Sequence, residues 1–156
     1  KLNHHQFSAR IYMIPYQAYK KHTIAKIPKS MQMPVFKHYI LKLADKLAKR
    51  YKGIVTGDNI GQVASQTLEN IHATGYGIEM PIYRPLLTYN KEEIMNLARK
   101  IGTYELSIEP YKDCCSILSQ GPNTRTTVKQ LHEALERIDF EQLLQKSKEE
   151  IEKFEI

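Results

Sequence analysis

The alternation of apolar and polar positions along the chain predicts short strands separated by helices. Three apolar runs have the length and composition of strands, and the second of them indicates a buried strand. These runs cover residues 9–15, 54–56 and 81–84. Apolar residues at helical spacing lie between and after the runs. The expected helices cover residues 33–51, 60–72, 91–101, 128–138 and 143–154.

Each predicted helix has an inward apolar face and an outward polar face. The inward residues that we expect in three of them are Ile60, Val63, Ala64, Thr67, Leu68 and Ile71, then Ile94, Leu97, Ala98 and Ile101, and finally Leu143, Leu144, Ile151 and Phe154. Asn90 followed by Glu93 has the pattern of a capping box, and Gly102 is placed to end the helix that begins there. His38 falls among lysines on the polar face of residues 33–51, so we expect it at the surface, in contact with phosphate or simply solvated.

Strands that alternate with helices predict an α/β fold, a parallel sheet covered by helices. Right-handed crossovers then bring the carboxyl ends of the strands to one edge of the sheet. Functional groups are therefore expected after Pro15, Thr56 and Arg84.

Composition and charge narrow the class of protein. The chain has 156 residues, 42% of them hydrophobic and 26% charged, and it lacks an apolar run of the roughly 20 residues that a membrane helix needs. It starts at Lys1 without a Met or a signal-peptide pattern, so we expect a cut end and a cytoplasmic protein without membrane contact. Residues 1–53 hold 12 Lys/Arg and one acid, whereas residues 54–156 hold 11 Lys/Arg and 16 acids. A basic segment of this kind suits a nucleic-acid partner, although a solvated lysine-rich surface is the alternative.

The segment from Val55 to Thr67 has the strongest pattern for a ligand site. A strand that ends at Gly57 lets the backbone approach a ligand closely, and Asp58 or Asn59 is suited to cap a following helix. We therefore predict the wall of a nucleotide pocket, with an ordinary tight turn as the alternative.

Cys114 and Cys115 are the two cysteines of the chain. A vicinal pair in a polar loop favours a reactive thiol over a structural disulfide. The six histidines are not paired with cysteines at zinc spacing, so no metal ligand is assigned. Two thiolates are too few for an iron–sulfur cluster, which takes three or four, so only a dimer or cysteines outside these residues would supply one.

Residues 56–68 resemble the TGD/E-x-x-GQVxSQTL signature of the tRNA 4-thiouridine synthetases, which are tRNA sulfurtransferases. Three further matches follow in order: Arg84-Pro85-Leu86, the stretch from Asn90 to Thr103, and Asp113-Cys114-Cys115-Ser116-Ile117. The resemblance implies an adenine-nucleotide alpha-hydrolase-like sheet, which is a Rossmann-like fold. It also implies an enzyme that uses Mg²⁺ and ATP to adenylate a uridine of tRNA, and then inserts sulfur from a persulfide donor such as a cysteine desulfurase.

Several residues match functional positions of that family. Gly57 and Gln66 match nucleotide contacts, and Lys37 stands where the family usually has Arg, which keeps the charge but not a bidentate grip on phosphate. Lys91 matches a lysine at the reaction centre, although by itself it would be an exposed first residue of a capped helix. When the family pattern is aligned without gaps from Lys91, its cysteine falls on Cys114. When it is aligned backwards from Pro122, the cysteine falls on Cys115. We prefer Cys115, because the residues after it, Ser116-Ile117-Leu118, also fit the family pattern.

The pyrophosphate-binding S-G-G-x-D-S loop of the family does not occur in these residues. We therefore expect residues 1–126 to be a partial ATP-pyrophosphatase domain of a thiamine-biosynthesis-type sulfurtransferase, with residues 127–156 as C-terminal helices packed on it. The chain would be a fragment or complementing subunit, inactive alone, that pairs with a chain carrying the loop or with a second copy. A non-catalytic RNA-binding or scaffold module is the alternative. The GQVASQTL stretch and the Asp113-Cys114-Cys115 stretch argue against a different base-modifying synthetase of the same group.

Overall fold

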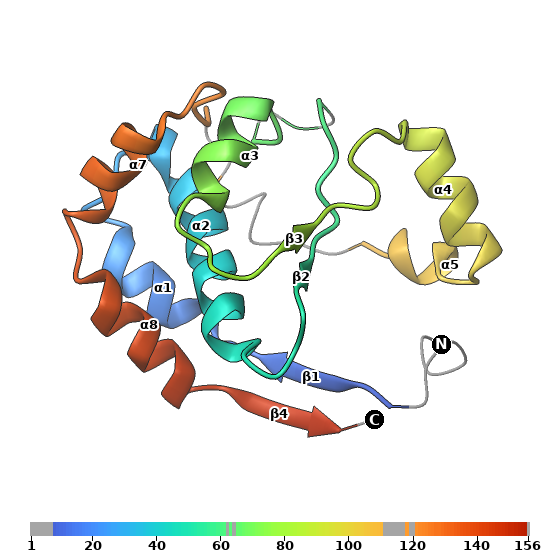
Figure 1. The fold of residues 1–156 in the computed structure, drawn as a ribbon, viewed down its shortest axis with the longest axis horizontal. Coiled ribbons are helices and arrows are strands. Elements are labelled where there is room, and N and C mark those ends of the chain that lie inside the picture. Colours follow the sequence, from blue (N-terminus) through green and yellow to red (C-terminus); the bar gives the residue numbers. More distant parts are fainter. Residues whose placement is uncertain (1–7, 62, 64, 111–117, 119–120, 156) are drawn as a thin grey trace.

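The computed structural model describes residues 8–61, 63, 65–110, 118 and 121–155. Helices dominate, and two small strand pairs accompany them (Figure 1). The elements in chain order are β1 (Arg10–Met13), α1 (Tyr16–Thr23), α2 (Lys29–Leu47), β2 (Ile54–Val55), α3 (Leu68–Gly75), β3 (Ile82–Tyr83), α4 (Lys91–Lys100), α5 (Tyr104–Ser107), α7 (Val128–Leu135), α8 (Phe140–Glu149) and β4 (Glu152–Glu155). None of these described helices combines the length and the apolar character needed to cross a bilayer.

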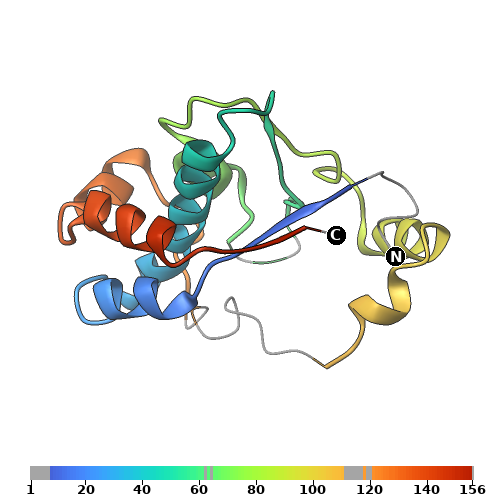
Figure 2. The ribbon, with the colours of Figure 1, turned by 90° about the horizontal axis from the view of Figure 1, so that it is seen from below.

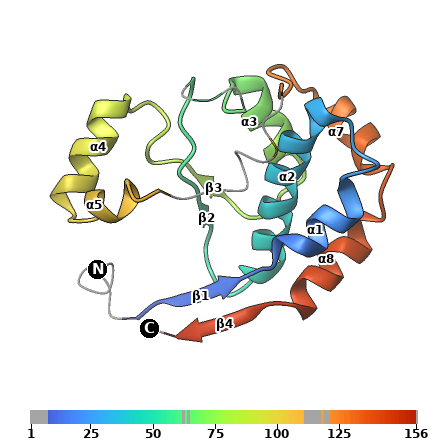
Figure 3. The same ribbon diagram turned by 180° about the vertical axis from the view of Figure 1, so that it is seen from behind.

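Helix α2 is the centre of the core, and α1, α3, α7 and α8 surround it (Figures 1 and 3). Its apolar periodicity was visible in the sequence, but the helix begins at Lys29 and ends at Leu47, about four residues earlier at each end than predicted. The rings of Tyr19 and Phe36 meet with centroids 4.8 Å apart, and Leu131 and Leu143 are fully buried beside them. This cluster fixes the position of α2 and therefore of the polar residues on its other faces.

His38 is buried within this helical layer, so the prediction of a surface histidine was wrong. Its Nδ1 lies 2.9 Å from the backbone carbonyl of Thr74 in α3, and its ring stacks on Phe140. Burial lowers the pKa of His38 despite that hydrogen bond. The helix turns His38 inward because α3 packs on the face of α2 that the lysine pattern had suggested was solvated.

Strands β2 and β3 form the predicted parallel pair, with Ile54 opposite Ile82. The N–H of Ile54 donates to Pro81 and the N–H of Thr56 to Tyr83, so both strands end at the same edge. Strand β1 was expected in this sheet, but it instead pairs antiparallel with β4 (Figure 2). Phe154 thus belongs to a strand and is exposed, not helical and inward as predicted. Residues 152–155 leave the helical path because β1 offers them a hydrogen-bonding edge and an ion pair between Arg10 and Glu155 at 2.8 Å.

The helix predicted for residues 60–72 begins only at Leu68, and its expected inward residue Val63 is exposed. Gly61 adopts a φ of +78°, which interrupts a helix, and the side chain of Thr67 caps the later start by accepting from the N–H of Asn70 at 3.2 Å. The described residues between β2 and α3 are consequently not helical, and neither Asp58 nor Asn59 is the helix cap.

Helices α4 and α5 form an arm on the side of β2 and β3 away from the α1, α7 and α8 helices (Figures 1 and 3). The predicted capping box of Asn90 and Glu93 is present, and Gly102 ends the helix at a φ of +71°. The inward face predicted for this helix is wrong, because no residue of α4 is buried in the described part of the chain. The guanidinium of Arg99 instead lies 4.2 Å from the ring centre of Tyr104, which ties α4 to α5.

Candidate functional site

The segments that follow β2 and β3 lie against each other at the carboxyl edge of the parallel pair. The N–H of Ile60 donates to the carbonyl of Leu87 at 3.0 Å. Asn59, which is buried, donates through its side-chain amide to the carbonyls of Leu86, at 2.8 Å, and Tyr89. Since an unpaired buried carbonyl is costly, this amide holds the two loops in one arrangement.

Asp58 is the electrostatic centre of this edge. Its Oδ1 accepts from Nζ of Lys37 at 3.0 Å, and its Oδ2 accepts from Nε of Arg84 at 3.3 Å and from Oγ1 of Thr56 at 2.8 Å. The three partners come from α2, from the residue after β3 and from the residue after β2. One carboxylate therefore joins three segments that are far apart in the sequence.

The carboxylate of Asp58 remains ionised in this setting. Burial by itself raises its pKa, but the ammonium of Lys37, the hydrogen bonds from Lys37 and Thr56, and the guanidinium of Arg84 outweigh burial and lower the pKa overall. Two cations surround one anion, so the cluster keeps a net positive charge. A phosphate group is the ligand that such an edge would attract.

Gly57 borders this cluster and is open to solvent. A Cβ built at Gly57 meets no atom within 4 Å, and its φ is not in the left-handed region, so neither sterics nor backbone strain of the described protein requires glycine there. An open backbone beside two cations is suited to close approach by a ligand. This is the arrangement expected if the glycine serves binding instead of folding.

Gln66 lies at the far end of the same connection, one residue before the cap of α3. Its carbonyl accepts from the N–H of Gly61 at 3.1 Å, and its N–H donates to Val63 at 2.9 Å. The side chain is half-buried. These hydrogen bonds hold the backbone of Gln66 next to Gly61, four residues after Gly57.

Lys91 is the first residue of α4 and is exposed. The loop before it is the one that Asn59 clamps, and the capping box of Asn90 and Glu93 fixes the first turn with hydrogen bonds of 2.7 and 3.0 Å. The ammonium of Lys91 therefore projects from a well-anchored helix start. No described carboxylate lies within ion-pair distance of it.

Cys114 and Cys115 lie outside the described residues, but the segment after them is firmly anchored. Pro34 has no N–H, which frees the carbonyl of Ser30 one turn earlier in α2, and the N–H of Asn123 donates to that carbonyl at 2.9 Å. Asn70 of α3 donates to the carbonyl of Asn123 at 2.7 Å and accepts from the N–H of Thr126 at 2.9 Å. The chain that leaves the cysteine segment is thereby fixed to α2 and α3.

The site can hold an anion, whereas a protein-built metal centre is not evident. Among the described residues, no three His, Cys, Asp or Glu side chains gather in a way that suits a metal ion. Asp58 already satisfies two cations and a hydroxyl. A nucleotide fits the residues that are present, since Lys37 and Arg84 supply charge and Gly57 supplies open space.

Sequence reasoning selected Lys37, Gly57, Gln66 and Lys91, and missed the roles of Asp58 and Asn70. The local pattern predicts only a helix cap at Asp58, because its partners Lys37 and Arg84 are 21 and 26 residues away. Asn70 fell within a predicted amphipathic helix and gave no signal. Both act by joining distant loops, and a one-dimensional pattern does not record such contacts.

Comparison with known proteins gives consistent results. A family model described as thiamine biosynthesis protein (ThiI) matches residues 1–140. A probable tRNA sulfurtransferase of Caldanaerobacter subterraneus subsp. tengcongensis is 33% identical over 145 residues, covering 91% of this chain and 38% of the relative. One from Thermus thermophilus is 35% identical, covering 92% and 36%, and one from Natranaerobius thermophilus is 41% identical, covering 79% and 31%.

A crystal structure of a 4-thiouridine synthetase–RNA complex with bound ATP superposes with a TM-score of 0.87 at 29% identity. The match covers 96% of this chain and 40% of that one. It confirms the predicted α/β fold class, including the likeness to the synthetases. The chain thus spans about a third to two fifths of the length of the proteins that it matches.

Proposed function

Because the chain belongs to the thiamine biosynthesis protein (ThiI) family, we propose that it forms part of an ATP-dependent tRNA sulfurtransferase that makes 4-thiouridine. The relatives named tRNA sulfurtransferase and the synthetase–RNA complex with bound ATP support the reaction class. The single observation that carries the proposal is the cluster at the carboxyl edge of β2 and β3, where Lys37 meets Asp58 directly beside the open backbone of Gly57.

In the proposed reaction O4 of a tRNA uridine attacks the α-phosphate of ATP, which attaches AMP to O4 and releases pyrophosphate. The outer sulfur of a persulfide then attacks C4, AMP leaves with the oxygen, and the uridine is joined to the donor through a disulfide. Lys37 would bind phosphate, with its ammonium oriented by Asp58. Gly57 would let the nucleotide approach the backbone, and the side-chain amide of Gln66 would hydrogen-bond to it. Mg²⁺ would be held mainly by the phosphates, as is usual for this ion with nucleotides.

Lys91 would balance the phosphate charge that develops during transfer, since the capping box anchors the backbone that carries its ammonium. As a thiolate, Cys115, or its neighbour Cys114, would attack the donor's sulfur in that disulfide, which releases 4-thiouridine and leaves a disulfide between the cysteine and the donor. A thiol reductant would then restore both cysteines. The sulfur donor would be a persulfide-forming enzyme such as a cysteine desulfurase. The residues of the relatives beyond this chain would complete the enzyme.

Two substitutions in the intact protein, expressed from its own gene, test the nucleotide site. Lys37→Gln removes one charge-assisted contact, worth about 1.5–3 kcal/mol, so ATP affinity should fall about 10- to 150-fold in calorimetric titration. Gly57→Ala should also weaken ATP binding while leaving thermal stability unchanged, because its Cβ meets nothing. Lys21→Gln, a change of the same charge at an exposed position of α1, is the control.

The activity itself is tested by digesting tRNA after incubation with the protein, ATP and a persulfide donor, and measuring 4-thiouridine by mass spectrometry. Absence of ATP-dependent 4-thiouridine from the intact protein would overturn the proposal. Wild-type ATP affinity in both variants would overturn the assignment of the site. A Cys114→Ala/Cys115→Ala double variant that still forms 4-thiouridine at the wild-type rate would overturn the role proposed for the cysteines.

A further inference from the structure

Residues 121–127 follow the cysteine segment and are neither helix nor strand, so a ladder of their own hydrogen bonds does not hold them. Polar groups of other elements hold them instead. In Figure 1 this orange segment passes beside α3. Its attachments to α3 come from Asn70, which is 1% exposed, and from Thr67, the cap of that helix.

Asn70 and Thr67 bind successive parts of this segment. The side-chain amide of Asn70 donates to the carbonyl of Asn123 at 2.7 Å, and its oxygen accepts from the N–H of Thr126 at 2.9 Å. The hydroxyl of Thr67 donates to the carbonyl of Thr124 at 2.7 Å while it accepts from the N–H of Asn70 at 3.2 Å. Side chains at the start of α3 thus satisfy backbone groups along the whole of residues 123–126.

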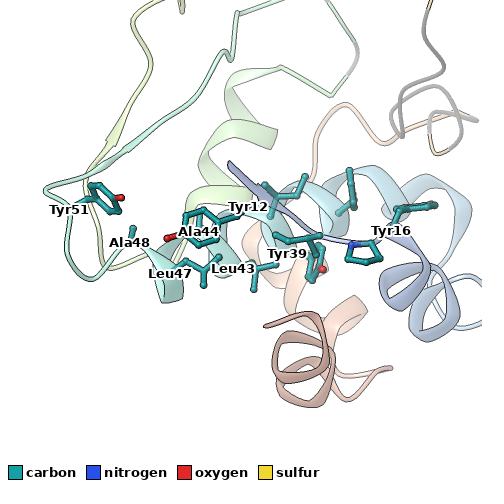
Figure 4. A pocket seen from close by; sticks show the side chains of 12 residues that line it. Tyr12, Tyr16, Tyr39, Leu43, Ala44, Leu47, Ala48 and Tyr51 are labelled. Atoms are coloured by element: carbon teal, nitrogen blue, oxygen red, sulfur yellow. The ribbon is translucent and has the colours of Figure 1, made fainter. Parts of the chain in front are cut away.

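The same stretch of chain is also attached to α2 and to the core. The N–H of Asn123 donates to the carbonyl of Ser30 at 2.9 Å, and Leu118 is buried in the apolar cluster around α2. These anchoring residues are not among those that line the apolar groove along α2, which Tyr12 and Tyr51 border (Figure 4). Because the anchors are contacts within the chain, they do not depend on how much of the surrounding surface another part of the protein covers.

The anchors connect the two parts of the proposed site. Thr67 directly follows Gln66, the expected nucleotide contact, and Cys115 lies shortly before Asn123 in the sequence. The helix that begins at the nucleotide loop therefore holds the chain that carries the cysteine. A reacting group must be held close to its target, and a misplacement of about 1 Å can cost about 100-fold in rate.

We propose that Asn70 and Thr67 are positioning residues for the sulfur-transfer step, an inference that rests on the proposed function. They set the path of residues 123–126 and, through it, the position from which the cysteine thiolate attacks the disulfide between uridine and donor. In this role neither side chain contacts the nucleotide or the reacting sulfur. ATP binding and adenylation of the uridine are therefore independent of both.

The test supplies the intact protein, ATP and tRNA with one of two sulfur sources. With a persulfide carried by a cysteine desulfurase, the cysteine thiolate must resolve the disulfide that forms. With sodium sulfide, the hydrosulfide ion attacks C4 of the adenylated uridine directly, AMP leaves with the oxygen, and the proton of the hydrosulfide moves to N3. This second route makes 4-thiouridine without a disulfide, so it reports adenylation and folding alone.

Two variants remove the anchors in different ways. Asn70→Ala removes both side-chain hydrogen bonds to the segment. Thr67→Val removes the hydroxyl with little change of shape. Each should lower the single-turnover rate of 4-thiouridine formation about 10- to 100-fold with the persulfide and leave the rate with sulfide unchanged. The disulfide-linked adduct of tRNA and desulfurase should accumulate in both, seen as a shifted tRNA band on a non-reducing gel.

Two further variants are the controls. Thr67→Ser keeps the hydroxyl and should retain the wild-type rate with both sulfur sources. Thr74→Val removes a hydroxyl that bonds within α3, to the carbonyl of Asn70 at 2.7 Å, and should also react as the wild type does.

An equal loss with both sulfur sources in Asn70→Ala and Thr67→Val would overturn the inference, because the fault would then lie in adenylation or in the fold. Wild-type rates in these two variants would overturn it too, and so would a loss of the same size in Thr74→Val. These results would leave the proposed function intact. A wild-type protein that forms no ATP-dependent 4-thiouridine from either source would overturn the proposed function and the inference together.

Discussion

Asp58→Asn is the most informative single substitution in this structure, because it removes a charge and changes almost no volume. In the native protein the carboxylate accepts from Lys37, Arg84 and Thr56. Asparagine keeps one acceptor oxygen, but its N–H₂ group replaces the second oxygen and faces one of the two cations. We expect the carboxyl edge of β2 and β3 to loosen while the helical core stays folded.

The size of the effect follows from the two ion pairs. Hydrogen bonds to charged groups contribute about 1.5–3 kcal/mol each, and partial solvent contact reduces this. The side chains of Asp58, Lys37 and Arg84 keep only 16%, 20% and 16% of their surface exposed, so the reduction is modest. One pair should be lost and one weakened, which gives a local cost of about 2–3 kcal/mol.

Hydrogen exchange followed by mass spectrometry measures this cost in the intact protein. The N–H groups of Ile54 and Thr56 are bonded to the carbonyls of Pro81 and Tyr83 and report the opening of the strand pair. A cost of about 2–3 kcal/mol should accelerate their exchange about 30- to 150-fold at pH 7. Asp139→Asn, at the exposed cap of α8, should accelerate exchange in α8 and leave β2 unchanged.

The pH dependence provides a second criterion. The pKa of Asp58 is lowered below its ordinary 3.8, so its stabilisation is complete above that value and is lost as the pH falls through the native pKa. The ratio of variant to wild-type exchange rates should hold steady from pH 7 to about 5 and shrink toward one only below about 4. A ratio within threefold of one at pH 7 would refute the role given to Asp58.

Three other substitutions test the remaining anchors. Asn70→Ala leaves the carbonyl of Asn123 and the N–H of Thr126 without their partner, so we expect a loss of local stability of about 2–4 kcal/mol. This loss should appear as faster hydrogen exchange in residues 121–127, and unchanged exchange there would contradict the prediction. Asn59→Ala releases the loop that positions Lys91, so it should reduce 4-thiouridine formation more than it reduces ATP affinity. An equal loss of both would argue against this positioning of Lys91 by Asn59. His38→Gln should flatten the fall in thermal stability between pH 7 and 5. The pKa of the buried His38 is lowered, so the stability that its neutral ring contributes is fully present above about pH 6.5 and is progressively lost as the pH falls below that value. A wild-type pH profile in that variant would contradict the assignment.

Local signals in the sequence specify most of the helices and strands and the ends of several of them. The capping box of Asn90 and Glu93 and the left-handed Gly102 define α4 through contacts within a few residues, and these were predictable. The two short strands of the parallel pair were predictable too, since apolar β-branched runs and glycine punctuation are local signals. The burial expected for residues 54–56 was wrong for Val55, which is exposed because no described segment covers that face of β2. The motif in residues 56–68 also indicated the family before any contact was known.

Tertiary structure alone decided which edge each strand meets and which faces are buried. Residues 151–155 have apolar positions compatible with an extension of α8, and only the free edge of β1 makes them a strand. His38 is buried because α3 packs over it, and the apolar face of α4 is not, because no described segment covers it. The charge cluster at Asp58 depends on side chains more than 20 residues apart. Pairing and packing of this kind are set by the free energy of the whole fold, which a local pattern of residues does not contain.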